Sequence, residues 1–168
     1  MGFNSLKDVL QEQLEDLHSA EEQLVVALPK MAHAAQHDEL RKAFEHHHAE
    51  TREHLTRVDE ALGELGISRP TEECKAMKGL IAEGDELMQK TGDPTAKDAA
   101  LIGAAQRVEH YEIAAYGTAR QLADDCGYDS IRDLMDQTLD EESNADKLLT
   151  KIATGGMFRA GVNQQAAR

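Results

Sequence analysis

Two glutamates occupy positions where a buried helix face should carry apolar side chains. Between Asp98 and Ala123, small or apolar residues recur every three or four positions, and the two inward positions at the centre of this stripe are Glu109 and Glu112. Burying an isolated carboxylate is costly, so such groups normally take up protons, find cationic partners or bind metal. The number of acids in this chain favours metal.

The same interruption recurs in the first and last periodic segments. Residues 10–31 carry an apolar stripe in which only Glu21 is not apolar. Residues 131–152 carry a second stripe with Glu142 at its centre, and Asp146 follows one turn later. Both segments therefore predict a helix that presents an acid to the interior.

A further segment, residues 38–65, places imidazoles on its inward face. His47 and His54 lie on the stripe, and Glu50 flanks it at about 100° of rotation per residue. The inward groups of all four segments lie near the middle of their helices, at a rise of about 1.5 Å per residue. We therefore expect them to meet at one level of a helical bundle.

Composition limits the classes of protein that the chain can belong to. Its 168 residues suffice for one domain with a substantial core, and its net charge of −14 opposes binding to nucleic acid or anionic membrane. The sequence has no long apolar run and no basic-then-apolar leader, so we expect no membrane span and a cytoplasmic location. Two widely separated cysteines, Cys74 and Cys126, do not indicate a disulfide framework or a zinc-thiolate site.

The periodicity predicts an all-α fold with four long helices. They are expected at residues 4–35, 38–64, 95–124 and 129–154. The connection between the second and third carries another short helical pattern and is long enough to cross a bundle from end to end. This is the ferritin-like arrangement of a four-helix bundle. We expect a helical domain over residues 1–154 and a flexible tail over 155–168, because the helical pattern stops after Ala153.

Carboxylate oxygens with one or two imidazoles suit iron or manganese better than a metal that prefers soft ligands. Glu109 and Glu112 share a helix face and can chelate together, as can Glu142 and Asp146. Bridging carboxylates can hold two such ions close together. We therefore expect two iron ions, or manganese as the alternative, and oxidase, peroxidase or catalase chemistry with oxygen or peroxide.

Four motifs in the chain can be compared with known families. The most specific is the block from Lys97 to Gly117, which contains Glu109-His110-Tyr111-Glu112. The others are His18 to Leu24, His47-x-x-Glu50-Thr51, and Thr138 to Glu142 with Asp146. Together they resemble the motifs of the YciE/YciF-type stress proteins, a branch of the ferritin-like superfamily. The resemblance extends over residues 5–153, and it implies a dimeric helical bundle with an interior dimetal site, a ferroxidase activity and a link to stress responses.

The chain departs from the broader ferritin-like pattern of Glu plus Glu-x-x-His in each half. Glu53 and Ala145 occupy the positions where the two histidines are expected. His47 or His54 could substitute in the second helix, and Glu112 or Asp146 in the other half. The predicted metal ligands are Glu21, Glu50, Glu109, Glu112, Glu142, Asp146 and His47.

Other interpretations of these residues remain open. The acids could form a buried polar cluster held by Arg, Lys or His, although the stripes supply almost no Lys or Arg at that level. His47 could hydrogen-bond a ligand carboxylate instead of binding metal, and Asp146 could pair with Lys147 or Lys151 on the surface. At the level of function, a metal-binding structural stress protein or an iron buffer without turnover is the alternative to an enzyme.

Overall fold

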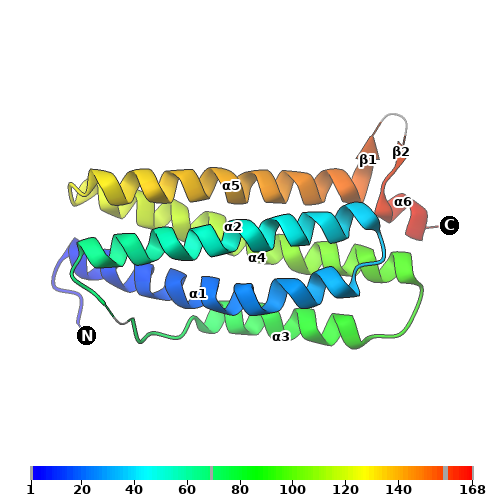
Figure 1. Cartoon of the computed structure of the whole chain (residues 1–168), viewed down its shortest axis with the longest axis horizontal. Helices are drawn as coiled ribbons and strands as arrows, with labels where there is room; N and C mark the ends of the chain where they lie inside the picture. The colour runs from blue at the N-terminus through cyan, green and yellow to red at the C-terminus, as the bar shows by residue number, and fades with distance from the viewer. Residues whose placement is uncertain (1, 69, 157–158, 168) are drawn as a thin grey trace.

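The computed structural model describes residues 2–68, 70–156 and 159–167, and four long helices lie side by side in it (Figure 1). They are α1 (Leu6–Ala34), α2 (Asp38–Glu64), α4 (Pro94–Asp125) and α5 (Asp129–Thr154). All four predicted helices are present, with bounds within two residues of those expected. Over the ranges described, no helix is long and apolar enough to cross a membrane.

The connections confirm the predicted ferritin-like bundle. Short turns join α1 to α2 and α4 to α5, so each pair is antiparallel (Figure 1). Between the pairs, α3 (Lys75–Gln89) runs along the bundle and packs on α1 and α4. Because this crossover returns the chain to the opposite end, α2 and α4 run in the same direction (Figure 1). The short helix predicted within the crossover is α3.

Local sequence signals explain where the helices begin. Ser5 and Asp8 form a capping box at the start of α1, in which each side chain accepts a hydrogen bond from the backbone of the other. At the start of α4, the Asp93 side chain accepts from the backbone N–H of Ala96, and Pro94 occupies the first turn. The thiol of Cys74 caps α3 in the same way, by accepting from the N–H of Met77.

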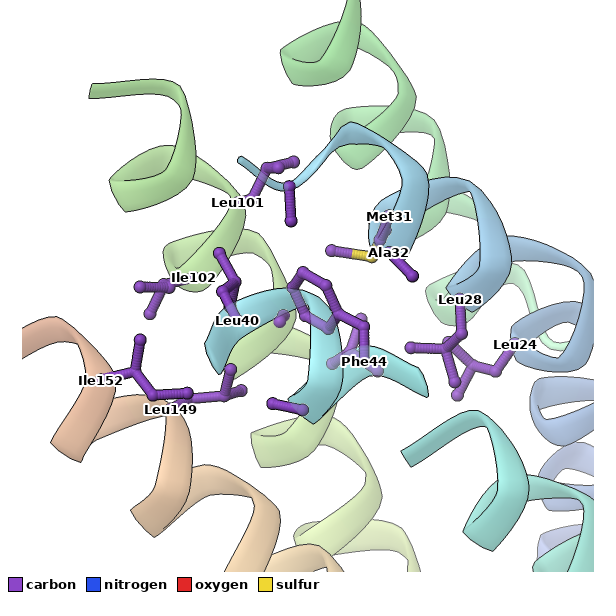
Figure 2. Packing of buried hydrophobic residues seen from close by; sticks show 14 of the residues in the cluster. Leu24, Leu28, Met31, Ala32, Leu40, Phe44, Leu101, Ile102, Leu149 and Ile152 are labelled. Carbon is purple, nitrogen blue, oxygen red and sulfur yellow. The ribbon is translucent and has the colours of Figure 1, made fainter. Parts of the chain in front are cut away.

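The core consists of two apolar clusters with a polar layer between them. On α1, for example, Leu17 belongs to one cluster and Leu24 to the other, and Glu21 lies between them. On α4, Val108 and Tyr116 are separated by the two glutamates in the same way. Figure 2 shows the cluster at the α1–α2 turn, where Leu24, Leu28, Met31, Leu40, Phe44, Leu101, Ile102, Leu149 and Ile152 pack together. The apolar clusters thus close both ends of the polar layer.

The segment after α5 has more structure than the sequence pattern indicated. It contains two short antiparallel strands, β1 (Gly155–Gly156) and β2 (Arg159–Ala160), and then α6 (Val162–Ala166). Val162 is fully buried and belongs to the same apolar cluster as Leu40 and Phe44. A five-residue helix with one buried side chain is too short to give a detectable periodicity, so the helical pattern of the sequence stops after Ala153 although α6 follows. The division into a domain over 1–154 and a flexible tail stays a prediction.

Candidate metal centre

The two glutamates of α4 point into the polar layer. Glu109 is 2% exposed and Glu112 is fully buried. They are three residues apart on a continuous helix, so their side chains share a face. The predicted inward orientation of both acids is therefore confirmed.

The other three long helices each supply at least one group to the same layer. Glu21 of α1 and Glu142 of α5 are fully buried, and α2 contributes His47 and His54, which are 4% and 0% exposed. His54 was not among the predicted ligands and was expected only as a possible substitute for a missing histidine. The signal was present, because His54 lies on the same apolar stripe as His47, seven residues further along.

These side chains form two groups of potential metal ligands that share one residue. The first contains His47, Glu109, Glu112 and Glu142, and the second contains Glu21, His54 and Glu142. Within each group, one nitrogen or oxygen atom per residue lies within 4.8 Å of the corresponding atoms of the others. Because Glu142 belongs to both groups, its two oxygens are available to two neighbouring positions.

Individual distances show how closely the imidazoles approach the acids. His47 Nε2 lies 3.5 Å from a Glu109 oxygen and 3.6 Å from a Glu142 oxygen. His54 Nδ1 lies 2.9 Å from Glu142 Oε1 and 3.6 Å from Glu21 Oε1. Most of these separations are too long for a hydrogen bond, and an ion placed among the atoms would contact several of them at once.

The buried polar atoms of this layer lack partners, which fits a metal site. Among the residues described, nine nitrogen and oxygen atoms of this layer have no hydrogen bond. They are both oxygens of Glu112 and of Glu142, one oxygen each of Glu21 and Glu109, both ring nitrogens of His47, and Nδ1 of His54. Buried polar atoms are nearly always paired, and leaving one unpaired costs about 1–3 kcal/mol. So many unpaired donor atoms within one small volume are the arrangement that a bound cation would satisfy.

Burial and mutual repulsion hold protons on most of the acids when no cation is present. Burial, with the charge of Glu142 next in effect, raises the pKa of Glu112 well above its ordinary value. Burial also raises the pKa of Glu109 well above its ordinary value, although the neighbouring His47 opposes the shift. Burial raises the pKa of Glu21 to about 7, against the opposing charge of His54. The layer thus binds protons at sites that a metal ion can take over.

His47 and Glu142, in contrast, are held in their charged forms. Burial lowers the pKa of His47, but the carboxylates of Glu109 and Glu142 outweigh it and raise this pKa to about 10. Burial raises the pKa of Glu142, but the charge of His47 and the contact with His54 outweigh it and leave this pKa below its ordinary value. A charged imidazole beside an ionised carboxylate therefore stands in for part of the missing cation.

A guanidinium lies close to the centre but does not neutralise the inner acids. Arg57 donates to both oxygens of Glu141, at 2.5 and 3.1 Å, and to the hydroxyl of Thr138. Glu141 in turn lies 2.9 Å from His54 Nε2. It therefore fixes the orientation of the imidazole, as carboxylates next to metal-binding histidines commonly do. Sequence reasoning missed this role of Glu141.

Two predicted ligands lie outside both groups. The side chain of Glu50 is 26% exposed and contacts His46 and His47, and that of Asp146 is 21% exposed. Asp146 accepts a hydrogen bond from Gln106 and lies 3.4 Å from His110 Nε2, both on α4. Among the residues described, no hydrogen bond or ion pair joins it to Lys147 or Lys151. The structure therefore brings five of the seven predicted ligands together, and ligand roles for Glu50 and Asp146 stay predictions.

Tyr116 closes the layer from the side of the second apolar cluster. Its ring is fully buried, and its hydroxyl donates a hydrogen bond to Glu21 Oε1. This bond leaves the other oxygen of Glu21 without a partner. Tyr116 thus orients the Glu21 carboxylate toward the second ligand group.

Comparisons with known proteins agree with this architecture. Residues 5–167 match the family model described as a domain of unknown function, DUF892. Protein YciF of Escherichia coli strain K12 is 39% identical over 165 residues, which cover 98% of this chain and 99% of YciF.

Solved structures give the same picture. The crystal structure of the E. coli stress protein YciF has a TM-score of 0.85 at 41% identity and covers 89% of this chain and 94% of that chain. The protein YcfI of Rhodopseudomonas palustris has a TM-score of 0.86 at 37% identity, with coverage of 89% and 96%. A dodecameric, bacterioferritin-related thioferritin of Bacteroides fragilis has a TM-score of 0.67 at 21% identity, with coverage of 88% of this chain and 84% of that one. At this identity the likeness supports the fold alone. The chain therefore belongs to the DUF892 family and is a relative of the E. coli stress protein YciF, as the resemblance predicted.

Proposed function

We propose that this chain binds two metal ions in its polar layer, with iron as the first choice and manganese as the alternative. His47, Glu109 and Glu112 would hold one ion, and Glu21 and His54 the other, with Glu142 between them. Carboxylate and imidazole ligands without thiolate suit these metals. Carboxylates and histidines projecting inward from four helices are also the usual way to build a dimetal site in such a bundle.

One observation carries this proposal. Glu142 is fully buried, belongs to both ligand groups, and has no hydrogen bond on either oxygen within the described structure. One oxygen of this buried carboxylate lies 2.9 Å from His54 Nδ1 and the other lies 3.6 Å from His47 Nε2, so the group faces both sets of donors and is suited to bridging two cations. The alternative of neutralisation by a guanidinium finds no support, because Arg57 is paired with Glu141.

The proposed activity is oxidation of ferrous iron, or of a reduced substrate, at the expense of oxygen or peroxide. Bound iron or manganese would supply the redox couple. The apolar clusters shield the layer from water at its two ends, and its carboxylates would offset the added positive charge of the oxidised state. Glu109 and Glu112, with raised pKa values, release protons when metal binds and can accept them again.

The cellular setting follows from the relatives. YciF is described as a stress protein, and we propose that this chain also acts in a stress response. We further propose a cytoplasmic location and a homodimer, as the resemblance to the YciE/YciF-type proteins implies.

The test is an anaerobic titration of the apoprotein with ferrous iron, followed by addition of oxygen or peroxide with an absorbance readout. We expect two ions per chain and oxidation faster than in buffer. Glu109→Gln should reduce both, because it removes a ligand charge with little change in volume. Glu22→Gln is the matched control, because Glu22 is exposed and lies next to the site residue Glu21.

Two other outcomes would change the conclusion. Stoichiometric binding without accelerated oxidation would favour the metal-binding structural stress protein or iron buffer. An absence of bound metal in the wild type would refute the proposal altogether.

A further inference from the structure

A cavity of about 110 Å³ lies between α2 and α5 and leads to the polar layer. Its lining includes His46, which is 69% exposed, and the exposed Leu148, so the cavity reaches the surface. At its inner end it is lined by His47 and Glu109, both members of the first ligand group. The cavity has room for several water molecules, and therefore for a partly hydrated ion.

Potential metal ligands follow one another along this cavity at short intervals. His46 Nε2 lies 3.3 Å from Glu50 Oε1, and Glu50 Oε2 lies 3.6 Å from His47 Nδ1. His47 Nε2 then lies 3.5 Å from Glu109 Oε1. Glu50 thus contacts an exposed imidazole with one oxygen and a buried imidazole with the other.

The inner imidazole of this series is poised to accept a ligand. The His47 side chain is 5% exposed, and neither of its ring nitrogens has a hydrogen bond in the described part of the chain. One nitrogen faces Glu50 and the cavity, and the other faces the ligand group. His47 therefore connects the cavity with the metal centre, because each of its two ring nitrogens faces one of them.

Once an incoming ion has displaced the proton of His47, the charges along the cavity favour a cation. None of the described residues that line it is Lys or Arg. Glu141 is paired with Arg57, whereas the ion-pair partners of Glu50 within the described ranges are the imidazoles of His46 and His47. A negative group at the mouth of a cleft raises the local concentration of cations and their rate of binding.

We propose that His46 and Glu50 form an outer transit site, through which divalent metal ions pass from solvent to His47 and the buried centre. This inference rests on the proposed function, because it requires an inner metal site. The carboxylate of Glu50 binds the ion first together with His46, and then passes it to His47 by rotating its flexible, partly exposed side chain. Glu50 is therefore a carrier of the ion and not one of its final ligands.

The test is the rate of Co²⁺ uptake by the full-length apoprotein, followed by stopped-flow absorbance. In Glu50→Gln we expect uptake to slow by about tenfold, the size of effect that electrostatic focusing produces. Release of Co²⁺ to a chelator should slow by the same factor, because a transit site affects passage in both directions. The final stoichiometry and the dissociation constant should stay as in the wild type.

Matched controls separate this effect from a general loss of charge. Glu53→Gln makes the same change one turn further along α2 at an exposed position, and it should leave the uptake rate unchanged. Ala145→Leu narrows the cavity without removing any ligand atom and should slow uptake, whereas Ala114→Leu, at an exposed position of α4 outside the cavity, should not.

The outcomes distinguish this proposal from the proposed function. Unchanged uptake in both Glu50→Gln and Ala145→Leu would overturn the transit site while leaving the metal centre intact. Loss of one bound ion in Glu50→Gln would also overturn it, since Glu50 would then be a permanent ligand. If the wild type bound no Co²⁺ at all, the proposed function itself would fail, and the transit site with it.

Discussion

Glu142 Oε1 on α5 lies 2.9 Å from His54 Nδ1 on α2, yet neither atom makes a hydrogen bond within the described structure. The two residues have different places in the polar layer. Glu142 belongs to both ligand groups, whereas His54 belongs only to the group with Glu21. Removing one or the other should therefore have different consequences for metal binding.

We predict that His54→Ala lowers the bound metal from two ions per chain to one, and that Glu142→Gln lowers binding at both positions. The reason is that His54 serves a single ligand group, while Glu142 is shared. Metal analysis after anaerobic loading with ferrous iron, together with calorimetric titration, measures both effects. Equal loss of metal in the two variants would contradict the shared role of Glu142.

The stability of the apoprotein should fall as the pH rises from about 5 to 9. The folded-state pKa values of Glu21, Glu109, Glu112 and His47 all lie above their ordinary values. The stability contributed by such a group is complete at low pH and is lost as the pH rises through the folded-state pKa. For Glu21 alone, the change from 4.5 to about 7 corresponds to about 3 kcal/mol.

Glu142 and Glu141 act in the opposite direction, because their pKa values are lowered. Their contribution is lost only below pH 4.5, so the apoprotein should be most stable near pH 5. Thermal unfolding at pH 5, 7 and 9 tests this, and loading with metal should reverse the trend, because the metal replaces the protons. An apoprotein more stable at pH 9 than at pH 5 would refute the prediction that buried groups with raised pKa values dominate the pH dependence of stability.

Glu141→Gln should weaken metal binding about tenfold without removing a ligand. Carboxylates that hydrogen-bond the other nitrogen of a metal-binding histidine, and so orient its ring, have effects of this size. Glu141 holds His54 Nε2 at 2.9 Å and is itself held by Arg57. Asp140→Asn makes the same kind of change at the adjacent exposed position and should leave the affinity unaltered. Competition with a chelator of known affinity provides the measurement.

The fold and the level of the site could be predicted because the relevant signals are local and periodic. A carboxylate on an apolar stripe marks an inward position on α1, α4 and α5, and imidazoles mark it on α2. These interruptions, all near mid-length, fix the layer. Glu21, Glu109, Glu112 and Glu142 were found in this way, and all are buried.

The features that were missed depend on contacts between distant segments. Asp98 of α4 accepts hydrogen bonds from the backbone N–H groups of Gln36 and His37 and so secures the start of α2, but nothing in the spacing of these residues indicates the pairing. Glu50 and Asp146 illustrate the converse. Each lies beside the inward stripe of its helix. A rotation of the helix by less than the roughly 100° that separates successive residues decides whether such a side chain reaches the centre or stays at the rim.

The buried position of Val162 gives a test of the segment after α5. Truncating this fully buried side chain in Val162→Ala should lower the free energy of unfolding by about 2 kcal/mol, through lost apolar burial and the space left behind. Asn163→Ala, at the adjacent exposed position, should change it little. Denaturant unfolding of the apoprotein provides the measurement, and its slope reports whether the segment unfolds together with the bundle. Equal stability of the two variants would mean that residues 155–168 behave as a flexible tail, because a side chain outside the packed core loses nothing on truncation.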